Sequence, residues 1–349
     1  MRQAAARLLV VALGLLATLA LAAPAQAHVG GGAAGSDYDA RIVSVEPAVP
    51  GVTVRILQFG DELELVNHGD AEVLVPGYSH EPYLRIGADG VWRNRNSPAT
   101  WLNLDLYGKA VADMPDGVDA AAEPEWERVS TEPAYVWHDH RTHWMSEGLL
   151  PPVVAAAPDQ PQTVSEWTVP LQVGGREVAV DGVLTWSPPP SPWTVWPAYA
   201  AIALLPVAAG LVLSGPRPLG AVLVIGAAAA LWHAAATPEP ASSLGSYAGA
   251  LASAAMPALA ALAVAVIGAR AAQRGRGVMT GLMALTLGWL LLVQGLPDVD
   301  VLWTANVLSN GPEWLGRIAV ALLVSLGVGL VGGGLAAVRR FREPSATTV

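Results

Sequence analysis

Five long apolar stretches in the second half of the chain constrain its fold more than any other feature. They cover residues 193–213, 218–236, 245–267, 278–296 and 314–338, and each is close to the ~20 residues that an α-helix needs to cross a bilayer. The positive mean hydropathy of the chain, +0.42, reflects this half. The sequence therefore predicts an α-helical membrane domain of about five transmembrane helices over 193–338, with the lipid bilayer as its partner and a cytoplasmic tail at 339–349.

The arginines between these stretches predict the orientation. Seven arginines fall in the connections that follow the first, third and fifth stretches, at positions Arg217, Arg270, Arg274, Arg276, Arg339, Arg340 and Arg342. On the other side there is a single arginine, Arg317, near the start of the fifth stretch, together with acidic residues. Because arginine and lysine collect on the cytoplasmic side, we expect a multi-pass protein of the cell membrane with an extracytoplasmic N-terminal domain and a cytoplasmic C-terminus.

The N-terminus agrees with this orientation. Residues 1–27 combine Arg2 and Arg7, an apolar stretch at 8–21 and the small-x-small sequence Ala25-Gln26-Ala27, which together are typical of a cleaved signal peptide. An uncleaved N-terminal anchor is the alternative. The chain has no cysteine, so the exported part folds without disulfides and contains no thiolate ligand or cysteine nucleophile.

The exported domain is predicted over 28–186. Residues 28–190 contain 24 acidic and 9 basic residues, a net charge near −15, and this charge excludes nucleic acid as a partner because phosphate binding requires the opposite sign. The negative charge favours cations in a general way, or it serves solubility alone. The Pro-rich residues 187–192 are predicted to be a stiff linker.

Short alternating or apolar runs between Pro, Gly and Asn/Asp residues predict strands in this domain. They lie at 41–45, 52–57, 62–66, 72–75 and 83–86, and a hairpin is expected at 165–186 around Gly174-Gly175. Residues 94–127 break the pattern and are expected to form a long excursion outside the core. The spacing favours an immunoglobulin-like antiparallel β-sandwich, so that the fold class is a mainly β exported domain followed by an α-helical membrane domain.

Three of the seven histidines fall within six residues, in the sequence Trp137-His-Asp-His-Arg-Thr-His-Trp-Met145. On a strand, His138 and His140 would share one face with Cα atoms about 7 Å apart, close enough for both rings to bind one metal ion. His143 joins them only if the strand turns at Arg141-Thr142.

His28 supports a copper site by a separate argument. Cleavage after residue 27 would make His28 the first residue, with an amino and a ring nitrogen in one chelate. In ligand types this resembles the CopC-type copper-binding domains, small exported β-sandwiches, and the resemblance implies a copper ion held by His28 and the His138/His140 pair. His143 is a fourth candidate ligand because of its place in the same motif.

Two alternatives to a metal site remain open. The histidines could form a hydrogen-bonded corner with Asp139 and Arg141, packed under the two flanking tryptophans, or they could act as a pH switch or partner contact.

A second cluster spans residues 77–86 and continues to Thr100, mixing aromatic, basic and amide side chains. It suits either a binding surface or a turn-rich set of strands whose Arg85, Arg93 and Arg95 pair with acids. This cluster and the Trp137–Met145 motif together resemble a family of uncharacterised membrane proteins of high-GC bacteria, and that resemblance implies no activity.

The sequence contains no nucleophile elbow, Walker loop, dinucleotide-binding glycine pattern or HExxH motif, and we expect no enzymatic activity. The first hypothesis is a membrane-anchored extracytoplasmic metal-binding protein for copper handling or delivery. The alternative is a structural or interaction protein of the cell envelope, with a membrane or envelope protein as its partner and its histidines in a structural hydrogen-bond network.

Overall fold

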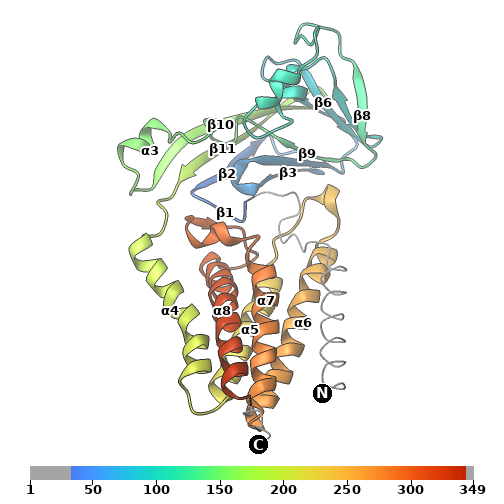
Figure 1. The fold of residues 1–349 in the computed structure, drawn as a ribbon. Helices are drawn as coiled ribbons and strands as arrows, with labels where there is room; N and C mark the ends of the chain where they lie inside the picture. The colour runs from blue at the N-terminus through green and yellow to red at the C-terminus, as the bar shows by residue number, and fades with distance from the viewer. Residues whose placement is uncertain (1–32, 343–349) are drawn as a thin grey trace, which may run out of the picture.

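A computed structural model describes residues 33–342 of the chain. The predicted signal peptide, His28 and residues 343–349 lie outside the described residues. Figure 1 shows the two parts of the molecule: a region of β-strands stands on one end of a bundle of long helices, and the last described helix, drawn in red, ends at the opposite end of that bundle.

Twelve strands and two short helices are described as follows. The strands are β1 (Gly35–Ser36), β2 (Tyr38–Glu46), β3 (Val52–Leu57), β4 (Glu62–Asn67), β5 (Val73–Pro76), β6 (Pro82–Gly87), β7 (Gly90–Asn94), β8 (Trp126–Ser130), β9 (Ala134–His138), β10 (Gln162–Val173), β11 (Arg176–Trp186) and β12 (Asn306–Val307). The short helices are α2 (Pro98–Leu102) and α3 (Pro152–Ala156). Strands β2-β11-β10-β5-β6-β7-β8 form one sheet in that order, β3-β4-β9 form a second, and β1 pairs with β12.

All strand pairings are antiparallel, and the predicted hairpin is confirmed. Val173 lies opposite Arg176 across Gly174 and Gly175, whose φ angles are 56° and 79°. Both glycines are therefore in the left-handed region that a two-residue turn of this kind requires.

The two larger sheets share one hydrophobic core. Leu63, Leu65 and Trp137 from the smaller sheet pack in the same buried cluster as Val75, Val180 and other residues of the larger sheet. Strand alternation explains the choice of residues, since every second side chain of each strand points to this layer.

The expectation that residues 94–127 lie outside the core was wrong for the start of this range, whereas none of the described side chains between 104 and 125 is buried. The end of β7, helix α2 and the start of β8 fall in this range, and Ala99 of α2 is fully buried in the shared core. The cap of α2 explains the error: Ser97 is buried and its side chain accepts a hydrogen bond from the Ala99 N–H, so a polar sequence forms a buried turn.

The predicted membrane domain contains five helices long and apolar enough to cross a membrane. They are α4 (Pro192–Leu211), α5 (Arg217–Ala235), α6 (Tyr247–Gln273), α7 (Gly277–Gly295) and α8 (Glu313–Arg340). Each overlaps one predicted stretch, so the chain has the helices of a multi-pass protein in a lipid bilayer.

Helix α8 lies between α4 and α7 and packs closely against both. A Cβ placed on Gly333 would overlap the carbonyl oxygen of Pro206 in α4, and one placed on Gly329 would overlap that of Ala203. On the other side, Gly334 faces Gly281 of α7 in the same way. Small residues allow backbones to approach this closely.

The two parts of the molecule also pair through their backbones. Strand β12, in the connection between α7 and α8, pairs with β1 at the start of the β region. The Asp37 side chain accepts a hydrogen bond from the Ala305 N–H, and the Asn306 side chain donates to the carbonyls of Ser36 and Tyr38. The β region therefore stands on the helix bundle through direct contacts, in addition to the connection at 187–191.

Candidate functional site

The candidate site is the segment that follows β9. Strand β9 ends at His138, which lies opposite Glu62 of β4, and the chain turns from Asp139 onward. His138 and His140 therefore do not share one face of a continuous strand. We call residues 137–144 the histidine corner.

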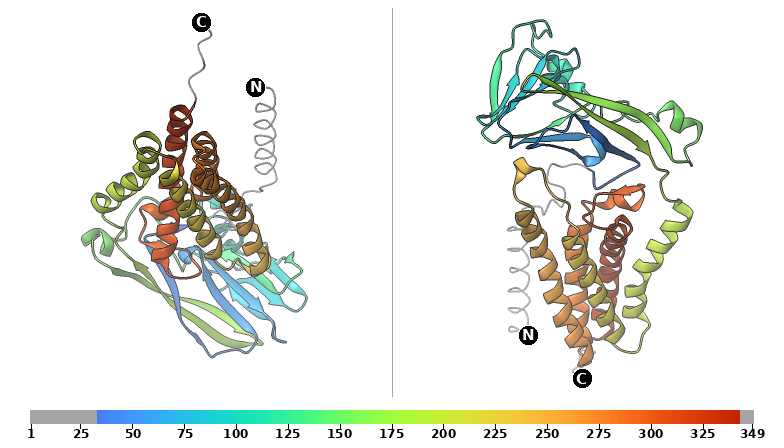
Figure 2. Two further views of the ribbon diagram at one scale, coloured as in Figure 1. Left: turned by 90° about the horizontal axis from the view of Figure 1, so that it is seen from below. Right: turned by 180° about the vertical axis from the view of Figure 1, so that it is seen from behind.

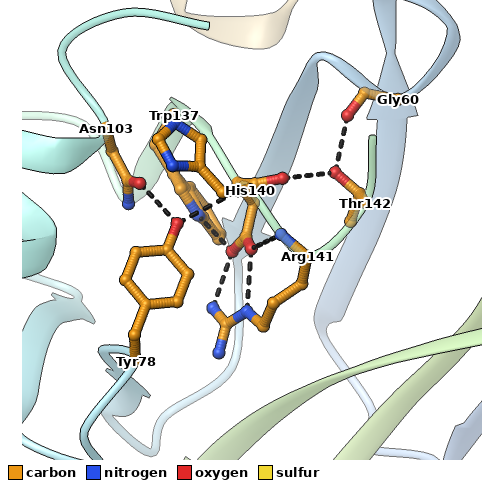
Figure 3. Close-up of polar contacts among 8 residues, drawn as sticks. Gly60, Tyr78, Asn103, Trp137, His140, Arg141 and Thr142 are labelled. Carbon is orange, nitrogen blue, oxygen red and sulfur yellow. Dashed lines mark hydrogen bonds and ion pairs between the residues drawn. The ribbon is translucent and has the colours of Figure 1, made fainter. Parts of the chain in front are cut away.

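Asp139 is the centre of the corner and is fully buried. Its carboxylate accepts hydrogen bonds from Trp137 Nε1 at 2.8 Å and from Arg141 Nε and Nη2, each at 2.7 Å. The Asp139 carbonyl also lies 2.8 Å from Thr142 Oγ1, which in addition contacts the Gly60 carbonyl. Figure 3 shows the side chains of Trp137 and Arg141 converging on the carboxylate. A buried carboxylate is tolerated because charged and polar donors replace its water.

Each of the three histidine rings already contacts a backbone carbonyl. His138 Nδ1 lies 2.8 Å from Asp61 O, His140 Nε2 lies 3.0 Å from Asp105 O, and His143 Nδ1 lies 3.3 Å from Trp144 O. A neutral imidazole has one N–H, so donation to a carbonyl accounts for it in each ring and fixes the tautomer.

His143 differs from the other two. It is buried, and its Nε2 has no hydrogen-bond partner within the described part of the chain. Burial lowers the pKa of His143 from 6.5 to about 4, so this imidazole is neutral at pH 7. Its ring meets the His140 ring edge to face, with centroids 5.4 Å apart.

Tyr78 joins the corner to the 77–86 cluster. Its hydroxyl donates to Asn103 Oδ1 and accepts the His140 N–H at 3.0 Å, while the Arg141 guanidinium lies 5.2 Å from its ring centroid. Burial raises the pKa of Tyr78 well above its usual 10, which keeps the hydroxyl protonated as a donor.

The arginines of this cluster pair with acids, as the second interpretation of the cluster predicted. Arg85 contacts Glu72 at 2.8 Å, and Arg93 contacts Glu127 and Arg95 contacts Glu125 at 3.3 Å each. These exposed pairs join neighbouring strands and add little to stability.

The predicted metal ligands do not form a metal site by themselves. Within residues 33–342, no group of three or more His, Asp or Glu side chains is arranged to hold a metal ion. His140 and His143 approach each other, His138 turns its Nδ1 to Asp61, and His28 lies outside the described residues. A three-ligand copper site would therefore need a ligand from outside the described residues, where the predicted ligand His28 lies.

A second polar cluster joins the β region to the helices, and sequence reasoning missed it. Glu64 of β4 is fully buried; its carboxylate accepts hydrogen bonds from Arg55 Nε at 2.7 Å and from the Ser242 N–H at 2.5 Å. Arg55 also donates to the Pro240 carbonyl and pairs with Glu239 at 3.4 Å. We call these five residues the interdomain clamp.

The clamp uses the face of β4 that points away from the core. Leu63 and Leu65 fill the core from one face, and Glu64 points to the other, where the connection between α5 and α6 covers it. In sequence, Glu64 reads as an ordinary outward-facing strand residue, and no pattern marks its partner 178 residues later.

Comparison of the chain with protein-family models, curated proteins and solved structures finds no match. The assignment of function therefore depends on the geometry described above.

Proposed function

We propose that the protein is a non-enzymatic component of the cell envelope, with an immunoglobulin-like β domain outside the cytoplasm as an interaction module for an envelope partner. One observation carries this proposal. One ring nitrogen of each of His138, His140 and His143 contacts a backbone carbonyl, and the Asp139 carboxylate is occupied by Trp137 and Arg141. Such a corner serves as internal structure that holds the module rigid.

The proposed orientation places the N-terminal domain outside and the C-terminus in the cytoplasm. The β region packs on the α5–α6 and α7–α8 connections; Glu239 lies in the first of these, and Arg317 lies near the start of α8 just after the second. All seven arginines counted on the other side occur near the opposite helix ends or in the turns there. This distribution follows the positive-inside rule.

The structural role is tested by thermal melting of the full-length protein in detergent. His138→Ala removes the contact with the Asp61 carbonyl, and we expect the same loss of Tm with and without a strong chelator, because no metal contributes. A loss of Tm that disappears in chelator would reject the structural role.

The interaction role is tested in native membranes. We expect the mildly solubilised chain to migrate in native gels above the size of the purified protein, and to return to that size when the contact is disrupted by high salt. Identical migration before and after purification rejects an envelope partner.

Copper handling is the second candidate, and the unpartnered Nε2 of buried His143 favours it. The tautomer of His143 is fixed, so its Nε2 carries a lone pair that can bind a metal ion. The ring centroids of His143 and His140 are 5.4 Å apart. In this proposal His28 supplies the remaining nitrogens. Neutral imidazoles are good Cu(II) ligands.

Equilibrium dialysis of full-length protein with Cu(II) tests this candidate, with mass spectrometry of the mature N-terminus beside it. We expect binding tighter than micromolar that is lost in His143→Ala and in a His138→Ala/His140→Ala double variant. His68→Ala, an exposed histidine outside the corner, is the matched control. Retained binding in both corner variants excludes the site.

A further inference from the structure

The segment between the histidine corner and β10 carries an apolar surface that none of the contacts above uses. From Gly148 to Pro158 the chain has no charged residue, although the surrounding domain is strongly acidic. Three large apolar side chains in it are exposed: Leu149 by 69%, Leu150 by 45% and Val153 by 40%. We call residues 148–158, which include α3, the apolar tip.

The apolar tip is held in one conformation by the rest of the domain. Trp144 Nε1 donates to the Leu149 carbonyl at 2.7 Å, and Trp186 Nε1 donates to the Pro158 carbonyl at 3.1 Å. Val154 of α3 is fully buried and fixes the turn from within. Ordering exposed apolar side chains in this way costs free energy unless an apolar partner covers them.

The tip lies next to the place where the chain enters the helix bundle. Its contact residue Trp186 ends β11, and α4 begins six residues later at Pro192, so the two points are at most about 20 Å apart. Figure 1 shows α3 above the near end of α4, and the view from below in Figure 2 places it outside the outline of the helix bundle. The tip therefore overhangs the region that lipid occupies beside α4.

Exposed tryptophans gather near the ends of α4 and α8 that face the β region. Trp193 and Trp196 lie in the first turns of α4, Trp303 stacks on Trp196, and Trp314 lies in the first turn of α8. Trp193 is 89% exposed. Tryptophan collects at the membrane interface, where its ring is half in lipid and half in water.

We propose that the apolar tip inserts Leu149, Leu150 and Val153 into the bilayer surface beside α4, as a lipid contact of the β domain. An uncharged tip suits zwitterionic headgroups, whereas the acidic domain around it disfavours anionic lipid. The contact fixes the tilt of the β domain on the membrane, and Trp144 connects it to the histidine corner.

The experiment exploits the absence of cysteine, which makes one introduced thiol the only labelling site. Leu150→Cys in the full-length chain is labelled with an environment-sensitive fluorophore and placed in phosphatidylcholine nanodiscs that contain nitroxide-labelled phosphatidylcholine. Trp193→Cys is the membrane reference. Leu104→Cys is the matched control, because Leu104 is a similarly exposed leucine (49%) two residues after the end of α2. Figure 1 shows the teal segment that contains α2 on the side of the β region away from the helix bundle.

We expect the lipid nitroxide to quench the label at position 150 about threefold more than at 104, approaching position 193, with reduced quenching by aqueous iodide. Equal quenching at 150 and 104 overturns the proposal. Protection from iodide without quenching by lipid also overturns it, because a protein partner or a second copy then covers the tip.

Discussion

The carboxylate of Glu64 in the β domain accepts a hydrogen bond from the backbone N–H of Ser242, a residue 178 positions later in the connection between α5 and α6. Arg55 pairs with the same carboxylate, so one buried charge is neutralised within the domain and also bound by the membrane half. The two halves of the molecule are thereby joined at a point remote from the 187–191 connection.

We expect Glu64→Gln to lower the free energy of unfolding by about 3 kcal/mol, because breaking the buried ion pair leaves Arg55 with only the exposed Glu239 as its ionic partner. Thermal or chemical unfolding of the full-length protein in detergent measures this loss. Glu72→Gln, which breaks the exposed pair with Arg85, is the control and should cost less than about 1 kcal/mol. Equal effects of the two substitutions would show that the clamp does not stabilise the junction.

Asp139→Asn should also lower the free energy of unfolding by about 3 kcal/mol. The new amide NH2 group would face the donor of either Trp137 or Arg141, so that donor would lose its acceptor in a buried site. The matched control is Asp181→Asn. Asp181 also accepts hydrogen bonds from two side chains, in this case the hydroxyls of Thr168 and Ser44, but it lies near the surface. Unfolding by denaturant compares the two, and an unchanged midpoint for Asp139→Asn contradicts the central role of this carboxylate.

The pH dependence of stability should contain two opposing contributions between pH 4 and 6.5. Burial lowers the pKa of His143 to about 4, so its unfolded form takes up a proton first, and stability is lost as the pH falls below 6.5. Burial raises the pKa of Asp61 to about 6, so its folded form takes up a proton first, and stability is gained over nearly the same fall. Each contribution is on the order of 3 kcal/mol.

Asp61→Asn separates these contributions. We expect the variant to be more stable than the parent at pH 7.5 and to lose this advantage near pH 4.5, where the parental Asp61 is protonated. Denaturant unfolding at both pH values measures the difference. Asp70→Asn removes the same charge at an exposed position, and at each pH its free energy of unfolding should be nearly equal to that of the parent. A constant offset for Asp61→Asn at both pH values contradicts the assigned pKa.

Gly333→Ala should weaken the packing of α4 on α8, because the added methyl group overlaps the carbonyl of Pro206 and the two backbones must move apart. The expected cost is about 1–3 kcal/mol. Gly332→Ala is the adjacent control: its methyl group would lie 3.3 Å from a Val207 side-chain carbon, which can adjust. Unfolding in mixed micelles compares the two variants, and equal stability would contradict close helix packing at Gly333.

The positions of single elements followed closely from the sequence. Each of the five apolar stretches became one long helix, and the strands at 52–57 and 62–66 appear as β3 and β4 with ends that agree within one residue. These predictions depend only on local periodicity and length, and tertiary contacts reinforce both here. The buried turn at Ser97–Ala99 was missed because its polarity is satisfied locally by a cap, which a hydrophobic pattern does not record.

The histidine corner was predicted only in part. The sequence placed His138, His140 and His143 near Asp139 and two tryptophans, and a hydrogen-bonded corner was one of its readings. It did not identify Asp61, Asp105 and Tyr78 as partners, since these groups come from distant segments that meet only in the folded domain.

The sequence alone determined which parts of this chain are apolar enough for a bilayer and which form strands, because both properties are set by residues close together along the chain. Only the tertiary structure decided that Glu64 is buried, that β12 pairs with β1 and that the apolar tip overhangs the region beside α4. Those outcomes depend on which surfaces meet when the two halves pack together. The contacts that stabilise this packing join residues far apart in the sequence, and no local pattern predicts which of them will meet.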